Sequence, residues 1–236
     1  MTGVCAVLGA ALAMTAHAQK PTVLDRVVAV VNNRAILESD LQTEVRLAVL
    51  EPASRANGGQ ETPQEALQRL ISRTLIRQQI RQEEAQATTP TTAEVENRLT
   101  ELRKELPVCA RENCATDEGW ATFLAKHDLT DRQVRIYLRN RLEILRFIEM
   151  RFRQGIRISQ RAVQDYYTET LLPQYLPGQT APPLDQVAPR IEEILLQQQV
   201  NALFSDWLDN LRKQGEVEVL DPTLEASDAP ASGGAQ

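Results

Sequence analysis

The residue types that most often carry catalytic chemistry are sparse in this chain. Beyond the first twenty residues there is one histidine, His127, within Lys126-His127-Asp128. A lone histidine at the expected end of a helix is typical of a partner for the helix dipole. No Ser/His/Asp set can be built without it, and the sequence holds no phosphate-binding loop, no glycine-rich dinucleotide turn and no His-Glu-x-x-His motif. We therefore expect no catalytic residues, no cofactor and no metal site.

Two cysteines, Cys109 and Cys114, lie five positions apart just after Pro107. Neighbouring cysteines in an exported chain favour a disulfide, and closing so short a loop stabilises by about 2 kcal/mol in the chain-entropy model. Two free thiols are the main alternative. A redox pair favours Cys-x-x-Cys spacing and a zinc site needs two further ligands, neither of which the sequence supplies. We predict a Cys109–Cys114 disulfide.

Aromatic side chains are few, at 4% of residues, and some of them stand in pairs. Trp120 and Phe123 are three positions apart on a short expected helix, a spacing that favours packing into a core. Tyr166-Tyr167 has the chemistry of a stacking platform, but its place near a helix end favours partial burial instead.

The elements that must position these side chains are mostly helices. Four segments open with Ser or Thr and place a Glu or Gln three positions later, the pattern of a helix-capping box. They are Ser39–Gln42, Thr62–Glu65, Thr91–Glu94 and Thr130–Gln133. Apolar residues then recur at steps of three and four. We predict helices over residues 39–50, 63–86, 92–106, 117–127, 131–154, 160–170 and 185–213.

Short β segments lie at both ends of this helical region. Leu24–Val31 is rich in valine, Asn32-Asn33 suits a tight turn because asparagine tolerates positive φ, and Ala35-Ile36-Leu37 completes a hairpin. Glu216–Leu220 alternates apolar and polar residues like a strand. The expected fold class is mainly α, a core of about seven helices with a small antiparallel sheet that joins the N-terminal hairpin to the C-terminal strand.

The helix over 131–154 has an apolar face and a basic face. The basic face holds Arg132, Arg135, Arg139, Arg146 and Arg153. One interpretation is a patch for an acidic partner. The better-supported one is a solvated face, because Glu143 and Glu149 lie three or four positions from three of these arginines.

The last helix, over 185–213, is about 40 Å long at 1.5 Å per residue. It carries apolar side chains from Val187 to Leu211. We expect so long an amphipathic helix to lie along other helices, because it would not be stable alone. Residues 171–184 are rich in proline and predict a loop, and the Ala/Ser/Pro/Gly/acid stretch 221–236 predicts a disordered tail.

The first nineteen residues carry no charged side chain. An apolar run over Val4–Ala13 leads to Ala16-His17-Ala18, a pattern typical of signal-peptide cleavage. We predict a signal peptide over residues 1–18, an exported chain from Gln19 and a single domain over 19–220. The alternative is a short uncleaved anchor, since Lys and Arg are missing ahead of the apolar run. No later stretch approaches the length of a membrane span, so we expect no stable membrane insertion after cleavage.

Composition excludes several classes of protein. With 42% hydrophobic and 25% charged residues, the chain is neither wholly disordered, collagen-like nor a polytopic membrane protein. The net charge is −6, and three of the acidic residues (Asp221, Glu225 and Asp228) lie in the last stretch. A body this close to neutral provides no electrostatic footprint for nucleic acid or an anionic membrane.

Several segments resemble one family. Asp25–Leu41, which reads DRVVAVVNNRAILESDL, resembles the start of the mature SurA-type periplasmic chaperones. Thr62–Arg81, with its Leu70-Ile71 and Leu75-Ile76 pairs, is similar to the long helix that follows in that family. Val187–Leu208 and Glu216–Leu220 are similar to its C-terminal helix and strand.

The resemblance implies a periplasmic, ATP-independent holdase for unfolded outer-membrane or other exported proteins, and it identifies no client-contacting residues. SurA-type chains usually carry parvulin prolyl-isomerase domains before the C-terminal helix. Here that interval is only Leu171–Leu184, and the paired histidines of a parvulin site are missing. The resemblance therefore implies no enzyme. Two alternatives stay open, a dedicated interaction subunit of an envelope assembly or of a separate parvulin, and a prolyl isomerase with an unrecognised site.

Overall fold

The structure is a computed structural model that describes residues 24–51, 61–83, 88–176 and 179–225. The predicted signal peptide, residues 1–18, and most of the predicted tail lie outside the described residues. The helices and strands confirm the expected class, a mainly helical fold with one small antiparallel sheet.

The sheet joins the two ends of the described chain. Strands β1 (Val27–Val31) and β2 (Arg34–Leu37) form the predicted hairpin, and β3 (Val217–Val219) pairs antiparallel with the other edge of β1, in the order β2-β1-β3. The turn residue Asn32 has a φ of 55°. Its side chain accepts from the backbone N–H of Glu216 at 2.9 Å and donates to Gln78 at 2.5 Å, so the turn is tied to both β3 and a helix.

Each of the seven predicted helices is present among the described residues, with ends shifted by a few positions. The helices are α1 (Glu38–Leu47), α2 (Pro63–Gln82), α3 (Thr92–Glu105), α4 (Cys109–Glu112), α5 (Asp117–Lys126), α6 (Asp131–Phe152), α7 (Gln160–Tyr166) and α8 (Leu184–Gln214). The four-residue α4 was not predicted. The predicted helix over 160–170 is divided, because α7 continues into a π-helical segment, Tyr167–Leu171.

Three of the four predicted capping boxes are confirmed, at Thr62, Thr91 and Thr130. The N–H of Glu65, for example, donates to Thr62 Oγ1 at 3.2 Å while the N–H of Thr62 donates to the Glu65 carboxylate at 2.9 Å. The box at Ser39 is wrong.

The first helix starts one residue before Ser39, at Glu38. The Asp40 carboxylate accepts from the N–H of Leu37, and the Ser39 hydroxyl donates to Asp25 instead of capping the helix.

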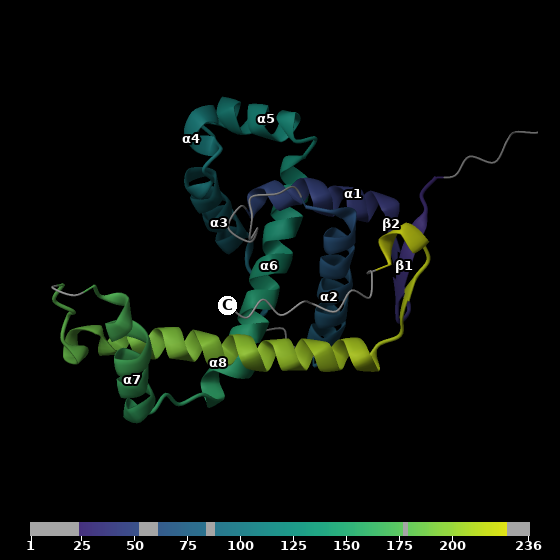
Figure 1. The fold of residues 1–236 in the computed structure, drawn as a ribbon. Coiled ribbons are helices and arrows are strands. Elements are labelled where there is room, and N and C mark those ends of the chain that lie inside the picture. The colour runs from purple at the N-terminus through teal and green to yellow at the C-terminus, as the bar shows by residue number, and fades with distance from the viewer. Residues whose placement is uncertain (1–23, 52–60, 84–87, 177–178, 226–236) are drawn as a thin grey trace, which may run out of the picture.

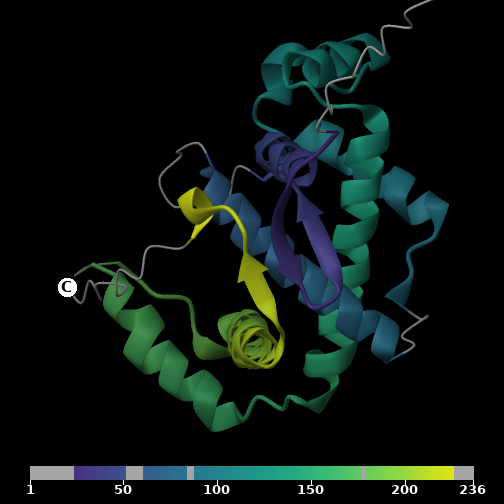
Figure 2. The ribbon, with the colours of Figure 1, turned by 90° about the vertical axis from the view of Figure 1, so that its right-hand side faces the viewer.

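The helices form a frame around the sheet. Figure 1 shows α2 and α6 side by side, with α1 across one end of the pair and α8 across the other. The sheet lies against α2. Helix α3 packs beside α6, and α4 and α5 lie beyond α1; with the adjoining part of α6, these helices form the α3–α6 lobe. Figure 2 looks along α8 and shows β3 leading directly from the end of that helix to the hairpin.

Three groups of buried side chains hold this frame together. The first surrounds Phe123, Val134 and the two cysteines in the α3–α6 lobe. The second lies between the sheet, α1 and α2. The third is small, with Ile76, Ile80 and Phe147 packed against half-buried side chains of α8.

The long helix α8 is less covered than we expected from its apolar pattern. Among its 31 residues only Ile191 and Val200 are buried. It crosses the ends of α2 and α6 and meets α7 near its own start, rather than lying along another helix for its full length (Figure 1). Much of its apolar face is therefore half-exposed.

The predicted tail begins too early. Residues 221–225 belong to the folded body, since Pro222–Leu224 form a short 3-10 turn and Leu224 is buried against the sheet and α2. Gln64 also donates to the carbonyl of Thr223 at 2.8 Å. Leu224 was overlooked because a single leucine in a polar stretch has no periodic pattern. The rest of the stretch, 226–236, lies outside the described residues.

Candidate functional site

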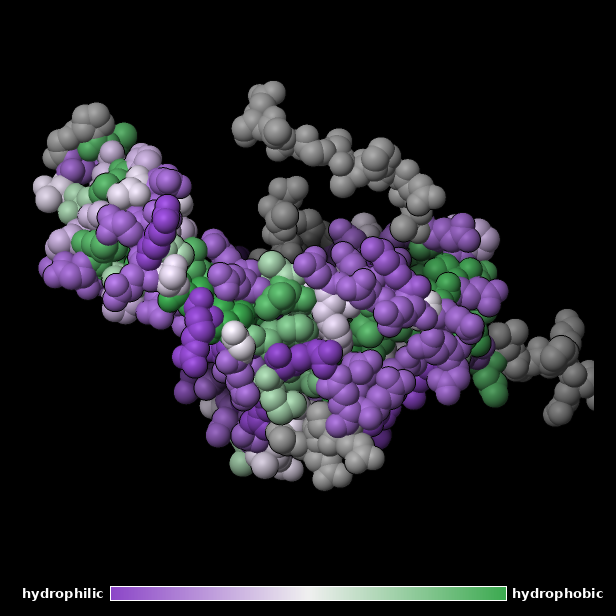
Figure 3. All heavy atoms as spheres, turned by 90° about the horizontal axis from the view of Figure 1, so that it is seen from below, coloured by the Kyte–Doolittle hydropathy of each residue, from purple (hydrophilic) through white to green (hydrophobic). Residues whose placement is uncertain are grey.

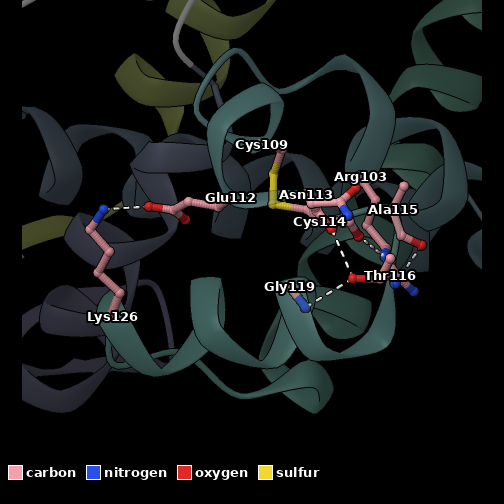
Figure 4. Close-up of a disulfide and its surroundings, with 9 residues drawn as sticks. All are labelled: Arg103, Cys109, Glu112, Asn113, Cys114, Ala115, Thr116, Gly119 and Lys126. Atoms are coloured by element: carbon pink, nitrogen blue, oxygen red, sulfur yellow. Dashed lines mark hydrogen bonds and ion pairs between the residues drawn. A yellow bond between two sulfur atoms is a disulfide. The ribbon is translucent and has the colours of Figure 1, made fainter.

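The two cysteines form the predicted disulfide, with their Cα atoms 5.0 Å apart (Figure 4). Both are buried in the α3–α6 lobe. Between them Asn113 turns the chain with a φ of 51°. Arg103, from α3, donates to the carbonyl oxygens of Cys114 at 2.6 Å and Ala115 at 3.1 Å. The disulfide therefore holds a structural turn between α3 and α5.

The turn after the disulfide leads directly into α5. The Thr116 hydroxyl donates to the carbonyl of Asn113 and accepts from the N–H of Gly119, both at 3.1 Å, which caps the helix. A Cβ at position 119 would lie 2.2 Å from the carbonyl oxygen of Asn113, so only glycine fits there.

We expect alkylation of the mature chain, unfolded without reductant, to label neither Cys109 nor Cys114. Reduction should expose both thiols and lower the free energy of unfolding by about 2 kcal/mol, because the closed loop is short. Mass spectrometry of the alkylated protein checks the first result and denaturant titration the second. Full labelling before reduction would show that the thiols are free.

The other residues singled out from the sequence have structural places. His127 ends α5 and packs on Phe123, with ring centroids 4.7 Å apart. Trp120 and Phe123 are buried core residues, as predicted. Tyr167 is half-buried and its hydroxyl donates to the carbonyl of Pro182 at 2.8 Å. In the part of the chain that the structure describes, no cluster of His, Cys, Asp and Glu could hold a metal ion.

The basic face of α6 is largely occupied by ion pairs to other elements. Arg146 pairs with Glu94 of α3, and this contact, with hydrogen bonds from Thr91, lowers the pKa of Glu94 to about 2. Arg135 pairs with Glu96, and Arg153 with Glu193 of α8 at 3.2 Å. These arginines therefore connect α6 to its neighbours, which argues against a patch reserved for an acidic partner.

A partly covered apolar region lies where α6 ends against α8. Phe152, Phe204 and Trp207 are half-buried and pack with ring centroids 5.6 to 6.3 Å apart. The Arg151 guanidinium lies 5.3 Å from the Trp207 ring centroid. Leu203, one turn earlier on α8, is 46% exposed. We call Phe152, Leu203, Phe204 and Trp207 the α8 surface.

The α8 surface continues along the helix. Leu196 lies seven positions before Leu203, on the same face of α8, and is also half-buried, so the apolar face extends toward α7. Figure 3, which views the molecule from the side of α8, shows apolar residues open between polar ones in the middle of this face. Aromatic and aliphatic side chains exposed in one region are typical of polypeptide-binding surfaces.

The hairpin, α1 and the long α2 lie in the part of the chain that matches a known protein family. The sequence profile of the SurA N-terminal domain matches residues 24–148, slightly more than half of the chain, from β1 through most of α6. The chain belongs to the SurA N-terminal domain family. This domain is a non-catalytic chaperone domain, and membership implies polypeptide binding in general terms. No curated protein matches the chain.

The match ends before α7, α8 and β3, so all four residues of the α8 surface lie outside the matched residues. Among the described residues, no helix combines the length and hydropathy that crossing a bilayer requires.

Sequence reasoning missed one group of functional candidates, the arginines of α2. They recur at every fourth position, Arg69, Arg73, Arg77 and Arg81, and so share one face of the helix. That spacing was the available signal. It did not show that buried Glu44 of α1, which is 3% exposed, pairs with two of them.

Proposed function

We propose that this protein is a periplasmic, ATP-independent holdase that binds unfolded outer-membrane or other exported polypeptides. Family membership supports a chaperone role, and the signal-peptide pattern of residues 1–18 supports export. Release would be driven by folding of the client, since the sequence holds no nucleotide-binding motif. On this proposal, residues 19–225 act together as one chaperone body.

The observation that carries the proposal is the α8 surface. Its aromatic rings and Leu203 form an apolar face that stays half-exposed, although α8 packs against α2 and α6 and leads into β3. An unfolded chain can bury its own apolar side chains there, at about 25 cal/mol per Å² of apolar surface removed from water. Such contacts require no particular sequence, as a holdase for varied clients needs.

We expect the intact chain to suppress light scattering by a urea-unfolded β-barrel protein diluted into buffer. Leu203→Glu should require several-fold more protein for the same suppression, because it places a charge in the middle of the α8 surface. Leu220→Glu is the matched control, since Leu220 is 47% exposed but lies beside β3. Unchanged scattering with the intact chain in excess would contradict the proposal.

The number of clients separates a holdase from a dedicated subunit. A holdase suppresses aggregation of several unrelated unfolded proteins and is crosslinked to many of them in the cell envelope. Capture of one abundant partner, with no suppression of other clients, would favour the dedicated-subunit alternative.

We also expect no prolyl-isomerase activity. His127, the lone histidine beyond residue 20, is packed on Phe123 at the end of α5 and is not part of a catalytic pair. In a protease-free assay, an X-Pro peptide should relax at its uncatalysed rate, over tens to hundreds of seconds at 25 °C. Acceleration that persists through further purification would revive the isomerase alternative.

A further inference from the structure

The four arginines Arg69, Arg73, Arg77 and Arg81 form a row along α2, and those near the end of the helix have fewer acidic partners than those near its start. Arg69 pairs with Glu44 and Glu61, and Arg73 donates twice to Glu44, at 2.6 and 2.8 Å. The next two arginines, Arg77 and Arg81, are much less well satisfied.

Among the described residues, the carboxylate that lies within 4 Å of Arg77 is that of Glu143, 3.5 Å from Nε, and this nitrogen is buried without a hydrogen bond. Arg81 is exposed and makes no ion pair to any described residue. Burial, together with the positive charges of Arg81, Arg34 and Arg73, lowers the pKa of Arg77. An added anion would therefore be stabilised at this end of the row.

These arginines line a groove of about 420 Å³ between β2, α1, α2 and α6. The lining holds four arginines, Arg34, Arg73, Arg77 and Arg81, against two carboxylates, Asp40 and Glu44. Four positive and two negative charges leave +2 among the lining side chains, or +1 when Glu143 beside Arg77 is counted, in a chain whose net charge is −6. Both carboxylates already have partners: Glu44 accepts a hydrogen bond from Arg73, and Asp40 accepts one from the N–H of Leu37.

The other walls of the groove suit an extended backbone. Strand β2 is an edge strand of the sheet and borders the groove through Arg34, Ala35 and Ile36. Edge strands present unpaired backbone groups to which an extended segment can add as a further strand. Across the groove, Gln133 and Asn140 of α6 supply side-chain amides, and exposed Ile136 supplies an apolar contact.

The spacing of the row selects a ligand pattern. Residues four apart on a helix are about 6 Å apart along its axis. In an extended chain, residues two apart are about 6.6–6.8 Å apart and point to the same side. Acidic side chains at alternate positions of a strand therefore match Arg77 and Arg81, and a carboxylate forms its strongest hydrogen bonds with guanidinium groups.

We propose that this groove binds an extended polypeptide segment that carries Asp or Glu at alternate positions, with the two carboxylates on Arg77 and Arg81. The inference rests on the proposed polypeptide-binding function, but it concerns a site separate from the α8 surface. The groove would add a charge preference to an otherwise apolar recognition of clients.

Calorimetric titration of the full mature chain at low salt tests the site. The probe is a nine-residue peptide of Thr and Ser, acetylated and amidated, with Glu at positions 4 and 6. We expect it to bind at least tenfold more tightly than the same peptide with Gln at both positions. Its affinity should fall as salt is added. Arg77→Gln with Arg81→Gln should remove this difference.

Matched controls separate the groove from general charge effects. Arg157→Gln with Arg190→Gln removes two exposed arginines far from the groove and should leave the affinity unchanged. If the Arg77/Arg81 variant fails to fold, the substitution Arg34→Gln at an exposed position of β2 replaces it and should lower the affinity for the Glu peptide several-fold.

Equal affinity for the Glu and Gln peptides would overturn the inference. If a peptide with Glu at positions 4 and 5 binds as tightly as the one with Glu at 4 and 6, the alternate spacing is wrong. Tight binding of a Gln peptide with a free C-terminus would overturn the inference by assigning the site to a terminal carboxylate. Failure of the holdase proposal can be distinguished from failure of this inference. It would appear as unchanged light scattering of the diluted client, whatever the peptide titrations show.

Discussion

A chain that ends at Pro183 is expected to lose cooperative unfolding and holdase activity together. This truncation removes α8, β3 and the turn that buries Leu224. The hairpin β1–β2 is left without its third strand, and a two-stranded hairpin is marginal in water. Ile76, Ile80 and Phe147 lose the side chains of α8 that cover them.

The expected size of this effect follows from the side chains removed. Buried apolar side chains contribute about 1.5–3 kcal/mol each, and half-buried ones about half as much. The lost contacts come from Val200, Phe204, Trp207, Leu208, Leu211, Val219 and Leu224. Their sum is comparable to a typical total stability of 5–15 kcal/mol.

Thermal unfolding followed by circular dichroism, with the light-scattering assay beside it, measures both losses. The control is a chain that ends at Glu225, which keeps every described contact of α8, β3 and Leu224. It should melt like the full chain. A chain ending at Pro183 that melts at the same temperature as this control would show that α8 contributes little to the fold.

The second large effect is expected for Phe147→Ala, which should lower the free energy of unfolding by about 3–5 kcal/mol. Phe147 is fully buried between α2 and α8, against Ile76 and Ile80, and its ring centroid lies 5.7 Å from that of Trp207. Removing the ring leaves a cavity where side chains of α2, α6 and α8 pack together. Denaturant titration gives the change directly.

Leu145→Ala on the same helix is the control for Phe147→Ala. Leu145 is 49% exposed, so its truncation should cost less than about 1 kcal/mol. Equal losses of unfolding free energy for the two variants would show that the buried group around Ile76, Ile80 and Phe147 does not hold α6 and α8 together. Trp207→Ala should fall between them, because that ring is only half-buried.

Local signals explain which helix starts were predictable. At Thr62, Thr91 and Thr130 the hydroxyl and the side chain three positions later complete the cap within one turn, so no distant residue is needed. Ser39 follows the same pattern but fails, because its hydroxyl is bound by Asp25, fourteen positions earlier. A distant carboxylate within hydrogen-bonding range decided that case.

The candidate sites were harder to predict than the elements that carry them. The Cys109–Cys114 pairing was accessible because both cysteines lie in one short loop. The α8 surface was not, since an apolar stripe from Val187 to Leu211 predicts burial equally along its length. How much of the stripe stays exposed depends on where α2 and α6 end, which no pattern within α8 records.

By itself, the sequence determined the helical class, the hairpin and its third strand, the disulfide and the family resemblance, because each depends on neighbouring residues or on a recurring pattern. Only the tertiary structure decided that Glu44 satisfies Arg69 and Arg73 while Arg77 and Arg81 stay open to the groove. The physical reason is that ion pairing depends on distances between side chains from different elements. Those distances are set when α1, α2 and α6 pack, and not by the regular spacing of the arginines along one helix.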